Sequence, residues 1–594
     1  MKPQLITLDF ETYFDKDYTL SKMTNEEYVR DPRFKVHCVG LRSDKGAATM
    51  PDLKNASALA SCHIIAHHAQ FDGFILSHHY NTKPAFWFDT LSMARLVHPH
   101  FKSHSLKALS DYYGLGVKTV PYDDIKGVRE LSPELYEALA SGCADDVELT
   151  YQLFTRLVRR VPKEELRVID LTVRMFTEPT LLLDKPRLQA YLDKVKQAKE
   201  STLAALGVDK ADLQSSSKFA ELLRAQGVEP PVKPSPTDSN KLIYAFSKTD
   251  DAMKELEEHG NPTVQQLCAA RLGQKSTIGE TRAERLLAMS ERGALPVYLN
   301  YCGAHTTRWS GGDSLNFQNF TRGSDLRLSL LAPPSCSLVV IDLSQIECRM
   351  LNWLAGQKDI LDAFREGRDL YSEGASRFYN RRITKADKVE RHLGKTLELG
   401  CGYGMGWSKF QLTCRKGALG GPPIILDDIS AAAAVSSYRD SHSKVVEMWK
   451  MADKILADLK EGGCEYSWGP MTIEGNFIVM PNGAALDYNN IHYSREEGFY
   501  TINKRNMRSH IYGAKLVENV VQALSRVVMS QAMLKIAEQY KIVMTCHDEI
   551  VFVAPTREAD SALEWATRIM KKAPDWCLGL PLDAEGGHDV RYSK

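Results

Sequence analysis

Residues 338–349 read LVVIDLSQIECR, and this stretch decides the fold. The apolar run from Leu338 to Ile341 is typical of a buried strand, which Asp342 ends. From Ile346 onward, apolar residues recur at helical spacing, so a helix follows the strand. A carboxylate at the tip of a buried strand is costly to desolvate unless a cation, a metal or a helix N-terminus pairs with it. From this stretch alone, Asp342 either caps the following helix or binds a metal.

The composition is that of a globular protein with several domains. A chain of 594 residues exceeds what one core usually supports, so we expect about two to four domains. Hydrophobic residues make up 43% and charged residues 25%, as in ordinary globular proteins. The formal net charge is zero, so a polyanion must bind at local basic surfaces.

The cysteines and the N-terminus indicate a cytoplasmic protein. The twelve cysteines include no CxxC pair, which argues against a zinc ribbon and a disulfide scaffold and favours a reducing compartment. The first residues lack the basic and then apolar pattern of a signal sequence. No run of about 18 apolar residues is present, so we expect no membrane association.

The first half of the chain changes character near residue 160. Residues 1–160 alternate apolar strands, at 5–8 and 63–66, with helical patterns, which indicates an α/β domain. Residues 161–295 are predicted to be mostly helical and strongly charged, and 264–289 form one long helix or two. Taken alone, the charges of this last segment favour a solvated helical face, with Arg271, Lys275, Arg282 and Arg285.

A second strand tip that bears an aspartate lies near the C-terminus. Residues 542–553 read IVMTCHDEIVFV, two β-rich runs around His547, Asp548 and Glu549, which is typical of a hairpin. An acidic pair in a turn is ordinarily only turn chemistry. If Asp342 and Asp548 lie side by side, however, they can hold two Mg²⁺ ions about 3.5–4 Å apart. Oxygen ligands of this kind suit Mg²⁺.

A basic helical stretch, RHLGKTLELGCGYG at 391–404, lies between the two acidic tips. At about 100° per residue, Arg391, Lys395 and Leu399 fall on one face, with Tyr403 just beyond. Two cations one turn apart are spaced to hold a polyphosphate. The alternative is a surface helix with salt bridges, although only Asp387 lies four residues from either cation.

Together, these three stretches resemble the three polymerase motifs of the family A DNA polymerases, in the family's order. The likeness extends upstream to residues 303–310 and to Gln318 and Asn319, which resemble the primer–template-binding loop. Downstream, residues 512–523 and 581–585 look like those of bacteriophage-type members.

Carboxylates scattered through the first domain carry a second resemblance. Asp9-Phe10-Glu11, Phe71-Asp72 and the stretch DVELT that begins at Asp146 together resemble the DEDD 3′–5′ proofreading exonucleases. The resemblance implies two Mg²⁺ ions that activate a water, held by Asp9, Glu11, Asp72 and Asp146.

Two positions of this domain depart from the family pattern. His68 stands where relatives often carry Asn. Gly142, four residues before Asp146, stands where they carry a Tyr that orients the water. We therefore expect either a slow proofreading activity or one that uses a substitute group, which the sequence does not identify.

The two resemblances imply a multidomain protein of the α/β and α+β classes. An RNase H-like exonuclease domain would span residues 1–160, and a helical linker and thumb 161–295. The thumb and a palm over residues 296–594 would form a right-hand polymerase domain. The fingers would be inserted in the palm at about residues 357–510. The palm would be an antiparallel sheet that carries Asp342 and the hairpin, and we expect no 5′-nuclease domain before residue 1.

The resemblance assigns the catalytic roles to matching positions. Asp342 and Asp548 would bind the metals, with the carbonyl of Leu343 as an added ligand and Glu549 as a supporting carboxylate. Arg391 and Lys395 would clamp the triphosphate, and Lys395 would also be the general acid for the leaving pyrophosphate. The primer–template duplex would be contacted in its minor groove by Arg308, Gln318, Asn319 and Gln522.

The resemblance also implies a nucleotide site, made of Arg391, Lys395, Gln345, Glu347, Leu399, Tyr403 and His547. Glu347 would exclude a ribose 2′-hydroxyl, Tyr403 would stack near the templating position, and His547 would touch the nucleotide or the primer end. Leu399 stands where the family often has Phe or Tyr. Because Leu cannot stack, we expect discrimination against dideoxynucleotides to differ.

The implied reaction is template-directed transfer of deoxynucleotides to a primer 3′ end, with two Mg²⁺ per active site and Mn²⁺ as an alternative ion. The implied partners are primer–template DNA, dNTPs and replisome proteins such as a helicase–primase, a single-strand-binding protein or a processivity factor. We expect a monomeric phage enzyme in the host cytoplasm. The rival hypotheses are a nuclease whose second half only binds DNA and a non-catalytic replication scaffold. An RNA polymerase is disfavoured by Glu347.

Overall fold

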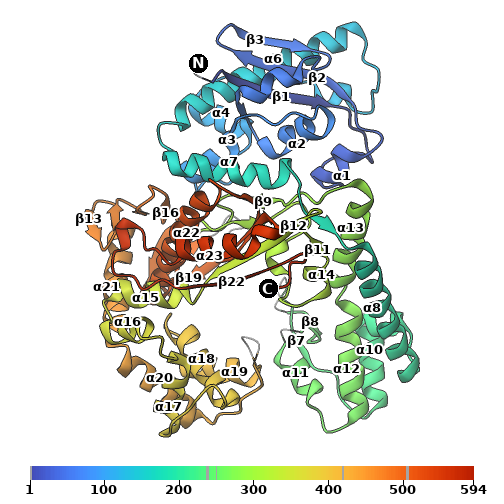
Figure 1. Ribbon diagram of the computed structural model, residues 1–594. Coiled ribbons are helices and arrows are strands. Elements are labelled where there is room, and N and C mark those ends of the chain that lie inside the picture. The colour runs from blue at the N-terminus through green and yellow to red at the C-terminus, as the bar shows by residue number, and fades with distance from the viewer. Residues whose placement is uncertain (1–2, 236–237, 239, 249, 418–420, 503–506) are drawn as a thin grey trace.

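The structure is a computed structural model that describes residues 3–235, 238, 240–248, 250–417, 421–502 and 507–594. Figure 1 shows the N-terminal sheet above a second sheet, with two groups of helices extending below. Within the described residues, no helix combines the length and the apolar content needed to cross a bilayer.

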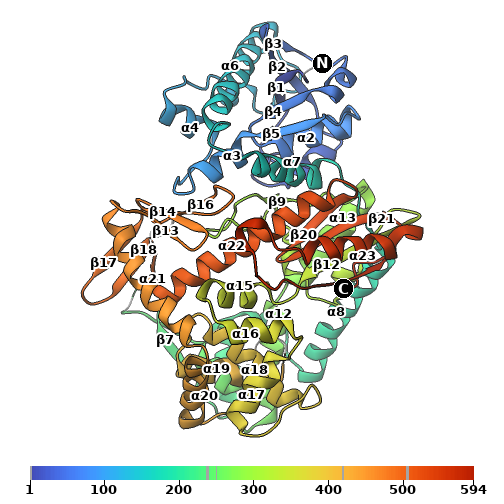
Figure 2. The same cartoon turned by 60° about the vertical axis from the view of Figure 1, so that its left-hand side comes forward.

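The N-terminal sheet has five strands in the order β3-β2-β1-β4-β5. They are β1 (Leu5–Thr12), β2 (Val36–Ser43), β3 (Gly46–Met50), β4 (His63–Ala66) and β5 (Phe86–Asp89). The first three strands pair antiparallel, and β4 and β5 add in parallel. Figure 2 shows α6 (Pro133–Leu157) on one side of this sheet, with α2 (Ala69–His79) and α7 (Lys163–Thr177) on the other. The predicted α/β domain is confirmed, and the topology is RNase H-like.

Helices dominate the next segment, as predicted. The long helices α8 (Lys185–Leu206) and α13 (Ile278–Arg292) pack together, and α12 (Pro262–Lys275) packs on α8. The shorter elements are α9 (Lys210–Gln214), α10 (Ser216–Ala225), β7 (Val232–Pro234), β8 (Leu242–Tyr244) and α11 (Asp251–Glu257).

The prediction of a solvated face is wrong for Arg271, which is fully buried. Its guanidinium packs against the rings of Phe219 and Phe246, at 4.5 and 4.9 Å from their centroids, and donates to the carbonyl of Leu213 at 2.5 Å. A planar guanidinium can stack on aromatic faces inside a small core. These partners come from other elements, so helical periodicity alone does not reveal them.

The second sheet is fully antiparallel, in the order β20-β21-β12-β22, as predicted for a palm. Its strands are β12 (Cys336–Leu343), β20 (Lys541–Cys546), β21 (Glu549–Pro555) and β22 (Ala584–Asp589). The run from Leu338 to Ile341 is at most 1% exposed, because both of its faces are covered. Helix α23 (Ala559–Met570) packs on β12 and β22, and α22 (Gly513–Ile536) packs on α23 and on α15 (Ile346–Ala355).

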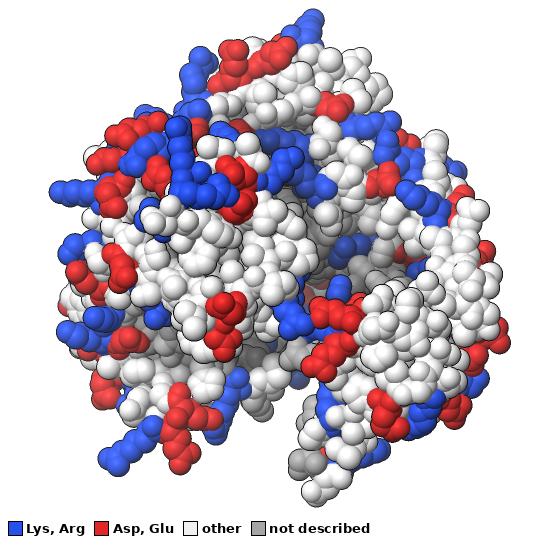
Figure 3. Space-filling model, turned by 90° about the horizontal axis from the view of Figure 1, so that it is seen from below, with Lys and Arg blue, Asp and Glu red and all other residues white. Residues whose placement is uncertain are grey.

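Helices inserted between β12 and α22 form the second group in the lower half of Figure 1. They are α16 (Lys358–Arg365), α17 (Leu370–Tyr379), α18 (Lys388–Cys401), α19 (Trp407–Arg415), α20 (Asp428–Ser441) and α21 (Ser443–Glu461). Two small sheets follow, β13-β14-β15-β16 between Glu465 and Asp487 and β17-β18-β19 between Ile491 and His510. Seen from below in Figure 3, the molecule is hollowed between these helices and the α8–α13 group, and Lys and Arg side chains gather along the walls.

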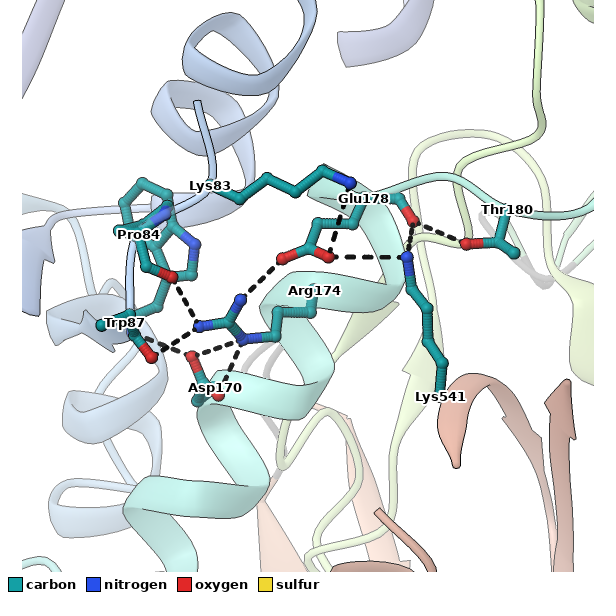
Figure 4. Close-up of polar contacts among 9 residues, drawn as sticks. Lys83, Pro84, Trp87, Asp170, Arg174, Glu178, Thr180 and Lys541 are labelled. Atoms are coloured by element: carbon teal, nitrogen blue, oxygen red, sulfur yellow. Dashed lines mark hydrogen bonds and ion pairs between the residues drawn. The ribbon is translucent and has the colours of Figure 1, made fainter. Parts of the chain in front are cut away.

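A charged row on α7 joins the N-terminal domain to the second sheet (Figure 4). Asp170, Arg174 and Glu178 are spaced four residues apart, so they share one helix face. Arg174 donates to both acids at 2.9 and 2.6 Å and to two carbonyls just before β5, at 2.9 and 3.0 Å. Lys541 of β20 donates to the carbonyl of Glu178 at 3.0 Å. The row therefore contacts both the segment before β5 and strand β20.

Candidate active sites

Two strand ends bring Asp342 and Asp548 together. Asp342 is the register partner of Glu549, and the amide of Leu343, between the two tips, donates to the carbonyl of Asp548 at 3.1 Å. The predicted hairpin is therefore confirmed. Asp342 does not cap the following helix, because the cap position of α15 is Gln345, with φ of 53° and no side-chain cap. The helix-cap role that the sequence left open for Asp342 is therefore excluded.

The electrostatics of this pair favour a bound cation. Burial, followed by the charges of Asp548 and Glu549, raises the pKa of Asp342 to about 7. Burial raises the pKa of Asp548 to about 6, although the nearby Arg308 opposes the shift. A divalent cation would relieve the desolvation and the repulsion that raise both values. The oxygen donors of the two carboxylates fit Mg²⁺.

Glu549 is held by side chains that sequence reasoning missed. Arg327 donates to its carboxylate at 2.8 Å, and the hydroxyl of Tyr592 donates to the same group. Arg322 lies 3.9 Å from Asp342 and 3.8 Å from Glu549. Arg327 thus compensates the charge of Glu549, whereas Asp342 faces a more distant and half-exposed cation. The contacts of Glu549 fit a role in holding the hairpin tip.

Five predicted site residues lie beside the aspartates. Arg308 donates to Glu347 at 2.5 Å and to Asp548 at 3.3 Å, so it lies in the carboxylate site itself. The hydroxyl of Tyr403 donates to Glu347 at 3.5 Å. The hairpin tip also contacts the short turn that contains Gln318. A ring nitrogen of His547 lies 3.1 Å from the carbonyl oxygen of Gln318.

Two further predicted DNA contacts have other partners. The side chain of Gln522 donates to Glu518 one turn earlier on α22, at 3.3 Å. The carbonyl of Asn319 accepts from Arg282 at 3.3 Å.

Helix α18 presents the predicted basic face. Arg391, Lys395 and Leu399 are partly exposed, whereas Leu393 and Leu397 on the opposite face are buried. Arg391 is paired with Asp369, the residue before α17, at 2.6 and 3.1 Å. Sequence reasoning missed this acid, because Asp369 stands at the cap position of another helix and is not at helical spacing from Arg391.

A second carboxylate cluster lies in the N-terminal domain. Asp9 and Glu11 on β1 and Asp146 on α6 each offer an oxygen within 4.8 Å of the others. Asp72 stands beside this cluster, and its carboxylate accepts from the amide of Phe10 at 3.1 Å. Three of the four predicted exonuclease acids therefore converge, and the fourth supports β1.

This cluster also fits a bound metal. Burial and then the charge of Asp146 raise the pKa of Asp9 to about 6, and burial followed by the charge of Asp9 raises the pKa of Glu11 well above its ordinary value. One oxygen of Asp146 is buried without a hydrogen-bond partner. The other is paired with the ammonium of Lys118, a residue that sequence reasoning missed.

The raised pKa of Asp342 predicts a pH-dependent difference in stability. Without metal, a folded-state pKa of about 7 against an ordinary 3.8 means that stability falls as the pH rises from about 4 to 7. Asp342→Asn removes this penalty. The variant should exceed the wild type by about 1–3 kcal/mol at pH 8 and match it near pH 4. Thermal melts with a chelator measure this, and a pH-independent difference would contradict it.

An antiparallel palm sheet with paired aspartates, joined to an RNase H-like domain with a carboxylate cluster, defines a nucleic-acid polymerase with an attached nuclease. The model of DNA polymerase family A matches residues 186–593, and a 3′–5′ exonuclease model matches residues 2–162. The chain belongs to DNA polymerase family A and joins a DNA polymerase domain to a 3′–5′ exonuclease domain.

Relatives span the chain to different extents. A DNA polymerase of Bacillus phage SP02 is 24% identical and covers 99% of both chains. The thermostable DNA polymerase I of Thermus thermophilus is 26% identical over 57% of this chain, which spans 37% of that enzyme. The Pol1 POL domain from M. smegmatis, solved with DNA primer-template and dNTP, has a TM-score of 0.69 at 18% identity. The match covers 100% of this chain and 96% of the M. smegmatis chain, and the two chains share the same fold.

Proposed function

We propose that the palm site adds deoxynucleotides to a primer 3′ end, as directed by a template strand. The observation that carries this proposal is the pairing of Asp342 and Asp548 at two strand tips, with pKa values raised to about 7 and 6. The M. smegmatis structure was solved with primer-template and dNTP, and its fold covers the whole of this chain. The hollow in Figure 3, with its basic walls, suits a duplex.

The residues would divide the work as follows. Asp342, Asp548 and the carbonyl of Leu343 would hold two Mg²⁺ ions, with Mn²⁺ as an alternative. Bound there, the metals lower the pKa of the primer 3′-hydroxyl and stabilise the charge on the phosphates. The 3′-hydroxyl would lose its proton to solvent, its oxygen would bond to the α-phosphorus, and the bond from that phosphorus to the pyrophosphate oxygen would break. Arg391 and Lys395 would bind the phosphates, and Lys395 would give a proton to the leaving pyrophosphate.

Side chains around the nucleotide would select it. Glu347, held between Arg308 and Tyr403, would crowd a ribose 2′-hydroxyl. His547 and Gln345 flank the aspartates in sequence and would contact the nucleotide or the primer end. The duplex would lie along Arg308, Gln318, Asn319 and Gln522, and Glu549 would support the hairpin tip.

The N-terminal site would remove mismatched nucleotides from the primer. Asp9, Glu11, Asp72 and Asp146 would hold two Mg²⁺ ions there. Three of these acids lie within 4.8 Å of one another, which supports the assignment.

The division into domains is also a proposal: exonuclease 1–160, linker and thumb 161–295, and palm 296–594 with fingers at about 357–510. It is supported by the separate N-terminal sheet, by the helices α8–α13, and by the insertion of α16–α21 between β12 and α22. We further propose a monomeric replicative enzyme of a phage, active in the host cytoplasm with replisome proteins. The relative from Bacillus phage SP02 supports this origin.

A primer-extension assay on a recessed template, with and without dNTPs, tests both activities. We expect Mg²⁺-dependent extension with dNTPs and Mg²⁺-dependent shortening of a mismatched primer without them. DNA binding without extension would favour a binding platform or a scaffold and overturn the polymerase proposal.

Leu399→Phe is expected to strengthen discrimination against dideoxynucleotides by about tenfold. A ring beside the sugar would make incorporation more sensitive to the sugar than the partly exposed Leu399 does. Competition between deoxy- and dideoxynucleotides at one template position measures the ratio. Leu412→Phe, at an exposed position on α19, is the matched control. Equal ratios for Leu399→Phe and the wild type would refute the expectation.

A further inference from the structure

A segment of the exonuclease domain, residues 118–122, crosses α6 at Gly142. A Cβ atom built at Gly142 would lie 2.7 Å from the Cα and 2.8 Å from the nitrogen of Val120. Such distances are too short for any side chain, so only glycine lets the segment approach this closely. A Tyr at position 142 would therefore clash with this segment, so the segment and a glycine at position 142 occur together.

The segment is held on the helix by contacts along its length. The ammonium of Lys118 pairs with Asp146, and the hydroxyl of Thr119 donates to Asp145 at 2.6 Å. Ile125, just beyond the segment, is buried in a small core with Leu139. The segment therefore has a defined position over the carboxylates.

The last residue of the segment, Tyr122, brings a phenol to the same place. The nitrogen of Lys118 lies 5.3 Å from the centre of its ring, and the ring of Phe14 packs 6.3 Å away. Burial and then the charge of Glu11 raise the pKa of Tyr122, so its hydroxyl stays protonated and can donate. The residue is 41% exposed, so a DNA end and a water can reach it.

We propose that Tyr122, held by Lys118, is the positioning residue that replaces the missing Tyr of the exonuclease site. This rests on the proposed removal of nucleotides from the primer 3′ end. The phenol orients a water whose oxygen bonds to the last phosphorus. The bond from that phosphorus to the 3′-oxygen of the preceding nucleotide breaks. The water gives its proton to solvent, and the 3′-oxygen takes one from solvent.

Lys118 contributes in two ways. Its ammonium lies over the ring of Tyr122, a cation–π contact that orients the phenol. It also offsets the charge of the acids that a DNA phosphate must approach. A purely blocking role for Lys118 makes the opposite prediction, because its removal would then speed cleavage.

The test compares Tyr122→Phe with the wild type in the full chain, on a 3′-labelled single-stranded oligonucleotide. We expect kcat for cleavage to fall about 100-fold, with KM, primer extension and the melting temperature unchanged. Mn²⁺ binding, measured by electron paramagnetic resonance without DNA, should also be unchanged, because Tyr122 is no metal ligand. Tyr112→Phe, at an exposed position of the same domain, should cleave at the wild-type rate.

Cleavage by Tyr122→Phe at the wild-type rate would overturn the inference alone. Lys118→Met should lower kcat for cleavage, and Lys118→Arg should retain part of the wild-type kcat. Faster cleavage by Lys118→Met would show that Lys118 blocks the site, and it would also overturn the inference. A separate comparison tests the exonuclease function itself. If the wild type does not cleave, or if Asp9→Ala cleaves as fast as the wild type, the proposed exonuclease function is overturned and the inference with it.

Discussion

Asp548→Asn is expected to lower primer extension at least about 10³-fold, which corresponds to about 4 kcal/mol of transition-state stabilisation. The substitution keeps the shape of the side chain but removes one of the two carboxylates at the strand tips. The burial that raises the pKa of Asp548 to about 6 also means that water cannot replace the lost charge. Rapid-quench measurement of single-nucleotide addition at saturating dNTP gives the rate.

Two comparisons make this result specific. Asp440→Asn, at an exposed position on α20, should extend primers at the wild-type rate. Asp548→Asn should still shorten a mismatched primer, because the exonuclease acids lie in a different sheet. Extension by Asp548→Asn at a wild-type rate would show that Asp548 is not a ligand of the catalytic metals. It would contradict the proposed metal site of Asp342 and Asp548.

Arg526→Met is expected to destabilise the folded protein by about 3–5 kcal/mol. The guanidinium of Arg526 on α22 donates to Glu165 on α7 at 2.5 Å, and both side chains are about 1% exposed. Burial would raise the pKa of Glu165, but Arg526 and the hydrogen bonds from Tyr301 and Asn482 outweigh it and hold the pKa below its ordinary value. Methionine would leave this carboxylate buried without its cation.

Urea denaturation, followed by the midpoint of the transition, measures the effect. Lys535→Met, at an exposed site on the same helix, should leave the midpoint unchanged. Combining Arg526→Met with Glu165→Gln should recover part of the loss, since no buried charge then remains unpaired. An unchanged midpoint for Arg526→Met would show that Glu165 is compensated by other groups.

Local patterns were enough to predict the elements that carry the polymerase acids. The apolar run before Asp342 and the two runs around His547 to Glu549 predicted a buried strand and a hairpin, and both are present. The same holds for the basic face of α18, because spacing along one helix determines which residues share a face. These features depend on neighbours within a few residues.

Features that depend on distant partners were not predictable in this way. The charge pattern predicts Arg271 in solvent, but it is buried against two rings, and helical spacing offers Arg391 only Asp387, but it is paired with Asp369. Lys118 and Tyr122 were not noticed, because neither belongs to a motif and their partners lie on other elements. Each of these environments is created by packing, which no periodicity records.

The stretch around Asp342 shows where the two kinds of information divide. The apolar run and the helical spacing after it predict a buried strand that ends in a carboxylate, because both patterns are local properties of the chain. Tertiary structure alone decided that this carboxylate faces Asp548, and that Gln345 rather than Asp342 occupies the helix cap position. The physical reason is that the cost of burying a charge is local, whereas the groups that compensate it are brought in from elsewhere by the fold.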